Sequence, residues 1–170
     1  AEVHVKGLGT LLVYVVHFKS KRAEWPQALA ANEVGLPDGV NLIANSLLAK
    51  QMGSWLSSIQ RGTEAALLYQ DIVEQMQCQE RPVVLMGDFN DSIESTPLQP
   101  LIASQYQDRL NGRSIADMSI EDRRSVQRFC LYDGFEIQEP PMPAERKPSH
   151  YFANKGNVLD YILLSKDFKL

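Results

Sequence analysis

The sequence is poor in cysteine, in long apolar runs and in positive charge. Its two cysteines, Cys78 and Cys130, allow one disulfide at most and lack the spacing of a metal site, so we expect two buried free thiols. No apolar run approaches the roughly 20 residues that span a bilayer, so no transmembrane segment is predicted. With 17 Lys and Arg against 21 Asp and Glu, the net charge is −4. This balance argues against a nucleic-acid substrate but does not exclude one, because an acidic protein can still carry a local basic rim.

The rest of the composition is that of an ordinary globular protein, with 44% hydrophobic and 22% charged residues. At 170 residues the chain fits one domain. Val3 and Val5 already alternate with polar residues, so the chain opens directly on a strand pattern. We therefore expect the natural amino terminus to lie upstream, and the compartment is left open.

The stretch 82–91, PVVLMGDFND, is where we expect the chemistry. Its apolar run 83–86, closed by Gly87, predicts a strand buried on both faces. Asp88 and Asn90 follow at the carboxyl end, and on extended backbone they project to the same side. A carboxylate with an amide suits a hard cation such as Mg²⁺ beside a phosphate oxygen. The alternative is an Asx-type turn, in which these side chains cap their own backbone.

Three motifs along the chain carry a family resemblance: VVHFKS at 15–20, GDFND at 87–91 and LDYILLS at 159–165. In this order they resemble signatures of the endonuclease/exonuclease/phosphatase superfamily, the group that contains deoxyribonuclease I. RGTEA at 61–65 resembles that family's R-x-x-x-A helix start. In an unrelated α/β domain, all three motifs would have to coincide in order and setting by chance.

The resemblance implies an α/β fold of the α+β kind: part of a four-layer αββα sandwich, mostly antiparallel sheet with flanking helices. Residues 1–170 would form the second half of one family domain, without its first half and its terminal Ser-Asp-His element. We expect strands that include residues 11–17, 83–86 and 160–164.

Between the first two of these strands, the pattern changes. Residues 23–58 predict an irregular insertion with at most one short helix, whose default role is a surface excursion. From residue 59 apolar residues recur at helical spacing, which predicts an amphipathic helix over 59–78, capped near Thr63 or by Ser57 or Ser58.

For chemistry, the resemblance implies a Mg²⁺-dependent phosphoesterase, with Mn²⁺ or Ca²⁺ as other candidate ions, whose substrate is a nucleic acid, lipid or sugar phosphate. Asp88 would orient or deprotonate the attacking water. Asn90 would hold a phosphoryl oxygen or help Asp88 to position the metal. His17 would serve acid/base or phosphate-stabilising chemistry, and Asp160 would hold a further histidine by a hydrogen bond.

Three more residues are candidate substrate contacts. Lys19 and Lys21 follow His17 and either form a solvated turn or contact a substrate phosphate. His150 lies in an aromatic stretch that the family places beside the substrate. Each histidine also has a plainer interpretation: His17 as a structural residue on an apolar strand, and His150 as a surface residue.

The family's main metal ligand, a glutamate of the first half, has no counterpart here, and no histidine follows Asp160. We therefore expect a fragment of a larger enzyme that is inactive alone and binds Mg²⁺ weakly. The alternative is a catalytically dead or truncated domain that acts as a binding or interaction module. A lone half-sandwich would also expose a broad apolar sheet face, so we expect self-association through that face.

Overall fold

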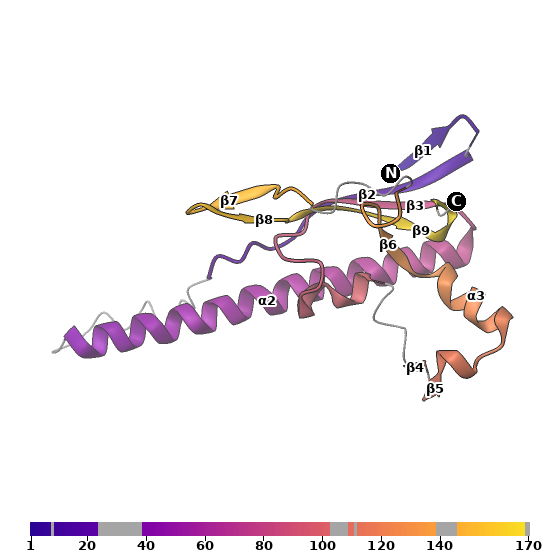
Figure 1. Cartoon of the computed structure of the whole chain (residues 1–170). Helices are drawn as coiled ribbons and strands as arrows, with labels where there is room; N and C mark the ends of the chain where they lie inside the picture. The colour runs from indigo at the N-terminus through magenta and orange to yellow at the C-terminus, as the bar shows by residue number, and fades with distance from the viewer. Residues whose placement is uncertain (8, 24–38, 103–108, 111, 139–145, 169–170) are drawn as a thin grey trace.

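The computed structural model describes residues 1–7, 9–23, 39–102, 109–110, 112–138 and 146–168. Its centre is a five-stranded sheet of order β1-β2-β3-β9-β6 (Figure 1). The strands are Glu2–Val5 (β1), Gly9–His17 (β2), Val83–Asp88 (β3), Leu131–Asp133 (β6) and Asp160–Ser165 (β9). The β2–β3 pair is parallel and the other three pairs are antiparallel. The expected mixed α/β class with a mostly antiparallel sheet is confirmed.

The second predicted strand is longer than its apolar run, since β3 continues through Gly87 to Asp88. Gly87 has a φ of 141°, and a Cβ at this position would lie 2.0 Å from the carbonyl oxygen of Val16. No other residue fits so close to the neighbouring strand. Glycine therefore lets β3 stay paired with β2 up to Asp88.

The connection between β2 and β3 contains one long helix, α2 (Gly39–Cys78). A parallel pair needs such a crossover. The expectation of an irregular segment up to residue 58 is wrong where the structure describes it, because the helix already begins at Gly39; residues 24–38 lie outside the described part. Thr63 is interior to the helix and donates its hydroxyl to the carbonyl of Ile59, so it is not a cap. Figure 1 shows α2 across one face of the sheet, with its N-terminal half extending past the sheet.

The main core lies between the C-terminal half of α2 and the covered face of the sheet. Ala65, Ile72 and Met76 of α2 pack there against Leu85 and Leu163 from the central strands. Phe89 joins this core and makes edge-to-face contacts with Phe18 at 5.4 Å and Tyr161 at 5.5 Å between ring centroids. These contacts hold the polar ends of β2, β3 and β9 together.

The remaining elements are short. They are η1 (Thr96–Leu101), β4 (Arg109–Leu110), β5 (Arg113–Ser114), η3 (Ile115–Asp117), α3 (Ile120–Arg128), β7 (His150–Phe152), β8 (Lys155–Asn157) and η4 (Lys166–Phe168). The β7–β8 hairpin turns through Ala153 and Asn154, which both have positive φ, as a two-residue hairpin turn requires. It extends from the end of the sheet where β9 begins (Figure 1).

Both cysteines are free, but only one matches its expected burial, because Cys130 is buried and Cys78 is exposed at the end of α2. Among the described helices, none combines the length and apolarity that a membrane crossing requires.

Candidate active site

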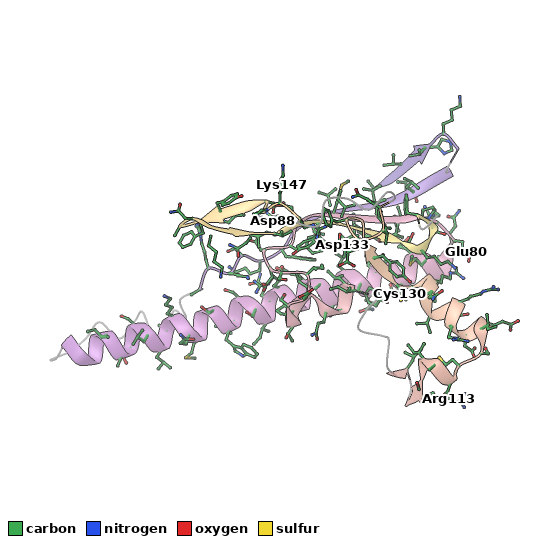
Figure 2. All side chains as sticks on the ribbon, viewed as in Figure 1. Glu80, Asp88, Arg113, Cys130, Asp133 and Lys147 are labelled. Carbon is green, nitrogen blue, oxygen red and sulfur yellow. The ribbon has the colours of Figure 1, made fainter. Side chains whose placement is uncertain are left out.

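Three of the four candidate catalytic residues lie side by side at one end of the sheet. His17 on β2 is the register partner of Asp88 on β3, and Asp88 is the register partner of Asp160 on β9. Register partners point to the same face of a sheet. His17 Nε2 lies 3.6 Å from Asp88 Oδ2, and both side chains reach solvent. Figure 2 labels Asp88 where the sheet meets the β7–β8 hairpin.

Asn90 points elsewhere. Its φ of 52° takes the chain out of the extended conformation, and its Nδ2 donates to the carbonyl of Phe18 at 2.9 Å. Its backbone N–H donates to Asp88 Oδ1 at 2.8 Å. The Asx-type turn that the sequence left as an alternative is therefore present, and the expectation that Asp88 and Asn90 project together from extended backbone is wrong. Asp88 uses one oxygen for this turn and directs the other toward His17.

A buried ion pair anchors the loop that follows Asn90. Arg61 of α2 is 2% exposed, and its NH2 group donates to Asp91 Oδ2 at 2.7 Å. The NH1 group of Arg61 donates to the carbonyl of Lys19 at 2.9 Å. This pair was not predicted from the sequence: both residues lie in the motifs that carry the family resemblance, but no local spacing joins positions thirty residues apart.

The ends of β2 and β3 are also fastened to each other. The backbone N–H of Phe18 donates to the carbonyl of Asp88 at 3.0 Å. The backbone N–H of Lys19 donates to Glu64 Oε2 on α2 at 2.7 Å. Since α2 holds both strand ends, it fixes the separation of His17 and Asp88 from the rear of the sheet.

The candidate substrate contacts have different surroundings. Lys21 Nζ lies 2.5 Å from Asp91 Oδ1, so its charge is already paired, and Lys19 is half-buried. His150 is exposed on β7, and none of the described contacts joins it to His17 or Asp88. Its neighbour Ser149 accepts hydrogen bonds from the backbone N–H groups of Leu159 and Asp160, which ties this stretch to the start of β9.

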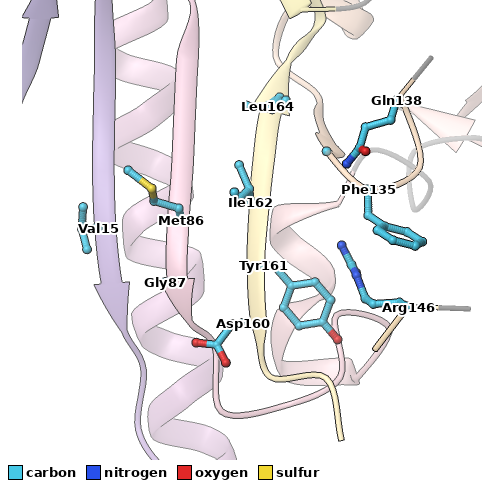
Figure 3. A pocket seen from close by; sticks show the side chains of 11 residues that line it. Val15, Met86, Gly87, Phe135, Gln138, Arg146, Asp160, Tyr161, Ile162 and Leu164 are labelled. Carbon is cyan, nitrogen blue, oxygen red and sulfur yellow. The ribbon is translucent and has the colours of Figure 1, made fainter. Parts of the chain in front are cut away.

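The face of the sheet opposite α2 is open. Figure 3 shows Val15, Met86 and Ile162 side by side on β2, β3 and β9, with Asp160 further along, at the start of β9. They line a hollow of about 680 Å³ whose other walls include Phe135 and Arg146. Val15 is 75% exposed and Ile162 is 50% exposed. The catalytic candidates therefore stand at the edge of an uncovered apolar surface.

A second hollow of about 400 Å³ includes Lys21, Asp133, Arg146 and Tyr161 in its lining. Arg146 donates to both carboxylate oxygens of Asp133 at 2.6 Å and stacks 4.9 Å from the ring centroid of Tyr161. Burial is the main cause that raises the pKa of Tyr161, whose hydroxyl donates to the carbonyl of Val158. Since Lys21 and Arg146 both face carboxylates, neither cation of this hollow is unbalanced.

The described side chains do not by themselves fit a Mg²⁺ ion. Among the described residues, His, Cys, Asp and Glu form no group of three or more that could hold a metal. Mg²⁺ requires near-octahedral ligation by oxygen atoms, whereas one carboxylate oxygen of Asp88 already accepts the hydrogen bond of the Asx turn.

A solved structure and a family model match this chain. The catalytic domain of human Nocturnin, whose structure was solved with a bound sulfate anion, is similar to this chain with a TM-score of 0.36 and 16% identity. The match covers 62% of this chain and 29% of the Nocturnin chain, so this chain spans less than a third of that solved chain. No curated protein matches the sequence. The profile of the Endonuclease/Exonuclease/phosphatase family matches residues 7–170, and the chain belongs to this family.

Proposed function

We propose that the chain carries part of the active site of a metal-dependent phosphoric-ester hydrolase, a nuclease or phosphatase, with His17, Asp88, Asn90 and Asp160 as its catalytic residues. The observation that supports this most is the row of His17, Asp88 and Asp160 on three adjacent strands. A structural histidine would be expected to lie in the core, whereas His17 is exposed beside a carboxylate.

Hydrolysis forms a bond from water oxygen to phosphorus and breaks the ester P–O bond, so water loses one proton and the leaving oxygen gains one. Asp88 Oδ2 is not engaged by the Asx turn and is placed to accept the proton from water. His17 Nε2 is 3.6 Å from that oxygen, within reach to share the proton or to face the phosphoryl group. Asn90 gives one amide hydrogen to Phe18 and keeps the second for a phosphoryl oxygen. Asp160 would orient a further donor.

We propose Mg²⁺ as the cofactor, with Mn²⁺ or Ca²⁺ as substitutes. A bound cation would offset charge on the phosphoryl oxygens. Asp88 and the side-chain oxygen of Asn90 would contribute ligands, and the others would come from outside the described residues. Titration calorimetry with MgCl2 should show weak binding to the 170-residue chain, lost in Asp88→Asn.

We propose that Lys19 and Lys21 contact the substrate phosphate and that His150 is a further substrate contact. Lys21 would do so while it remains paired with Asp91, so its replacement should raise KM more than it lowers kcat. His150 is placed on the hairpin beside the start of β9 and would reach the part of the substrate farther from the reacting bond.

The test is hydrolysis of an aryl phosphodiester and an aryl phosphomonoester by the longer protein that contains this chain. Asp88→Asn and His17→Gln should each lower kcat by at least 100-fold without lowering the melting temperature, because both side chains are partly or largely exposed. Gln51→Glu, an exposed change on α2, serves as the control. An unchanged rate in either site variant would reject the catalytic role of that residue.

A second candidate function, an interaction module without activity, is favoured by the uncovered sheet face. The exposure of Val15 and Ile162 supports self-association of the chain through this face. Sedimentation should then show dimers that Val15→Asp dissociates. A longer protein that binds a partner but hydrolyses neither ester would favour this candidate over the hydrolase.

A further inference from the structure

The N-terminal half of α2 carries an apolar stripe that nothing in the described structure covers. We call Leu48, Met52, Trp55 and Ile59 the outer stripe. Their exposed fractions are 51%, 45%, 67% and 48%. Spacings of four, three and four residues place them along one side of the helix, as in the seam of a coiled coil. Figure 2 shows side chains that project outward along this half of α2.

The outer stripe lies opposite the side of α2 that faces the rest of the chain. Ala49, Gly53 and Ser57 are buried, and Ser57 donates its hydroxyl to the carbonyl of Arg22. At 3.6 residues per turn, these inward positions are centred about 130° around the helix from the outer stripe. The helix therefore has one face occupied by its own chain and a second apolar face in solvent.

The charge of this region indicates what would cover it. Residues 39–60 contain a single charged side chain, Lys50. Nucleic acid or an anionic membrane would find almost no positive charge to recognise here. A second copy of the chain would meet no like-charge repulsion beyond that of two lysines.

The outer stripe is also self-complementary. Its centre lies between Gly53 and Ser54, so an antiparallel partner helix would set Leu48 against Ile59 and Met52 against Trp55. Met–aromatic contacts of this kind are favourable. We propose that two copies of the chain pair through the outer stripe, with the two α2 helices antiparallel about a two-fold axis.

The size of the contact predicts a weak dimer. The outer stripe, with the adjoining Leu56 at 44% exposure, leaves on the order of 500 Å² of apolar surface in water per copy. Two copies would bury about 1,000 Å², the lower limit of a specific interface. The monomer–dimer equilibrium should therefore fall in the micromolar range.

Analytical ultracentrifugation of the 170-residue chain from 1 to 200 µM tests this pairing. Trp55→Glu and Met52→Lys should each raise the dissociation constant at least tenfold with unchanged circular dichroism, because both side chains are exposed in the monomer. Lys50→Gln, an exposed change about half a turn around the same helix from the outer stripe, should leave it unchanged.

A mixing experiment tests the antiparallel arrangement. In an antiparallel pair, one copy with Met52→Lys and one with Trp55→Glu bring the introduced lysine against the introduced glutamate, and the other Met–Trp contact is kept. The mixture should therefore associate at concentrations where neither variant does so alone. A parallel pair would gain no such contact, so failure of the mixture to associate would overturn the two-fold model.

Three other outcomes would overturn the proposal. The unmodified chain could remain monomeric at 200 µM. Association could be lost in Val15→Asp and kept in Trp55→Glu, which would assign it to the open sheet face on the far side of the molecule from α2. The chain could stay monomeric yet float with phosphatidylcholine vesicles in a way that Trp55→Glu abolishes, which would make the outer stripe a lipid-binding surface.

Discussion

The two halves of α2 form one continuous helix in two different environments. Residues 61–78 bury Ala65, Ile72 and Met76 against the sheet, whereas residues 43–60 expose apolar side chains on several sides. Ile72 is fully buried and Ile59, thirteen residues earlier, is 48% exposed. Tertiary packing therefore stabilises the second half more than the first half, where the buried positions are the small residues Ala49, Gly53 and Ser57 and helix propagation contributes more.

Arg61 stands at the boundary between these halves, and its ion pair with Asp91 joins α2 to the candidate site. The largest effect should come from Asp91→Ala, because it leaves the Arg61 guanidinium buried without its carboxylate partner. We expect a loss of about 3–5 kcal/mol in the free energy of unfolding, the range for breaking a buried pair. Urea unfolding measures it.

The control is Lys21→Met, which removes the exposed partner of the same carboxylate and should cost about 1 kcal/mol or less. Equal losses in the two variants would show that Arg61 does not carry the contact that joins α2 to the loop after Asn90.

A matched pair of isoleucines tests the difference in burial between the two halves of α2. Ile72→Ala should lower the free energy of unfolding by about 2–5 kcal/mol, because it opens a cavity in the core. Ile59→Ala should change the stability of the monomer by about 0.5 kcal/mol or less. Both are measured by urea unfolding at protein concentrations below 1 µM, where association through the outer stripe is negligible. Equal effects would mean that the N-terminal half is buried in solution.

Hydrogen exchange compares the halves without mutation. Backbone amides of residues 63–76 should open only with global unfolding, since their helix face lies in the core. Amides of residues 44–56 should exchange at least tenfold faster, because few packed contacts oppose local fraying. Mass spectrometry of peptides from the two segments measures this difference in exchange rate. Uniform protection along α2 at low concentration would contradict the distinction.

The smallest effect concerns a contact of the packed half, in which Tyr14 of β2 donates its hydroxyl to Asp71 of α2 at 2.5 Å. Burial, followed by this hydrogen bond and the charge of Asp71, raises the pKa of Tyr14 well above its ordinary value of 10. A raised pKa in the folded state means that the contribution to stability is complete below about pH 10 and declines as pH rises above it.

Tyr14→Phe should cost about 1 kcal/mol at pH 7 and make the alkaline loss of stability shallower. Thermal unfolding between pH 7 and 11 provides the comparison, with Tyr151→Phe on the exposed hairpin as its control. An identical pH slope in Tyr14→Phe and the unmodified chain would mean that Tyr14 is not linked to folding.

Periodicity found the half of α2 that packs and missed the half that does not. Residues 61–78 place their apolar side chains on one face, and this spacing predicted a helix from residue 59. Residues 39–58 have apolar side chains on several sides, so no single face stands out, and they were wrongly expected to be mostly irregular. Among the candidate site residues, the motifs selected His17, Asp88, Asn90 and Asp160, but their catalytic roles remain predictions.

The strands at β2, β3 and β9, the family and the mixed α/β class could be predicted from the sequence, because alternation, apolar runs and motifs are properties of neighbours in the chain. The folded structure, and no local pattern, makes His17, Asp88 and Asp160 register partners. It alone turned Asn90 toward Phe18 and paired Arg61 with Asp91. These relations join positions 30 to 72 residues apart, and they depend on how the sheet is aligned and on which charges become buried together.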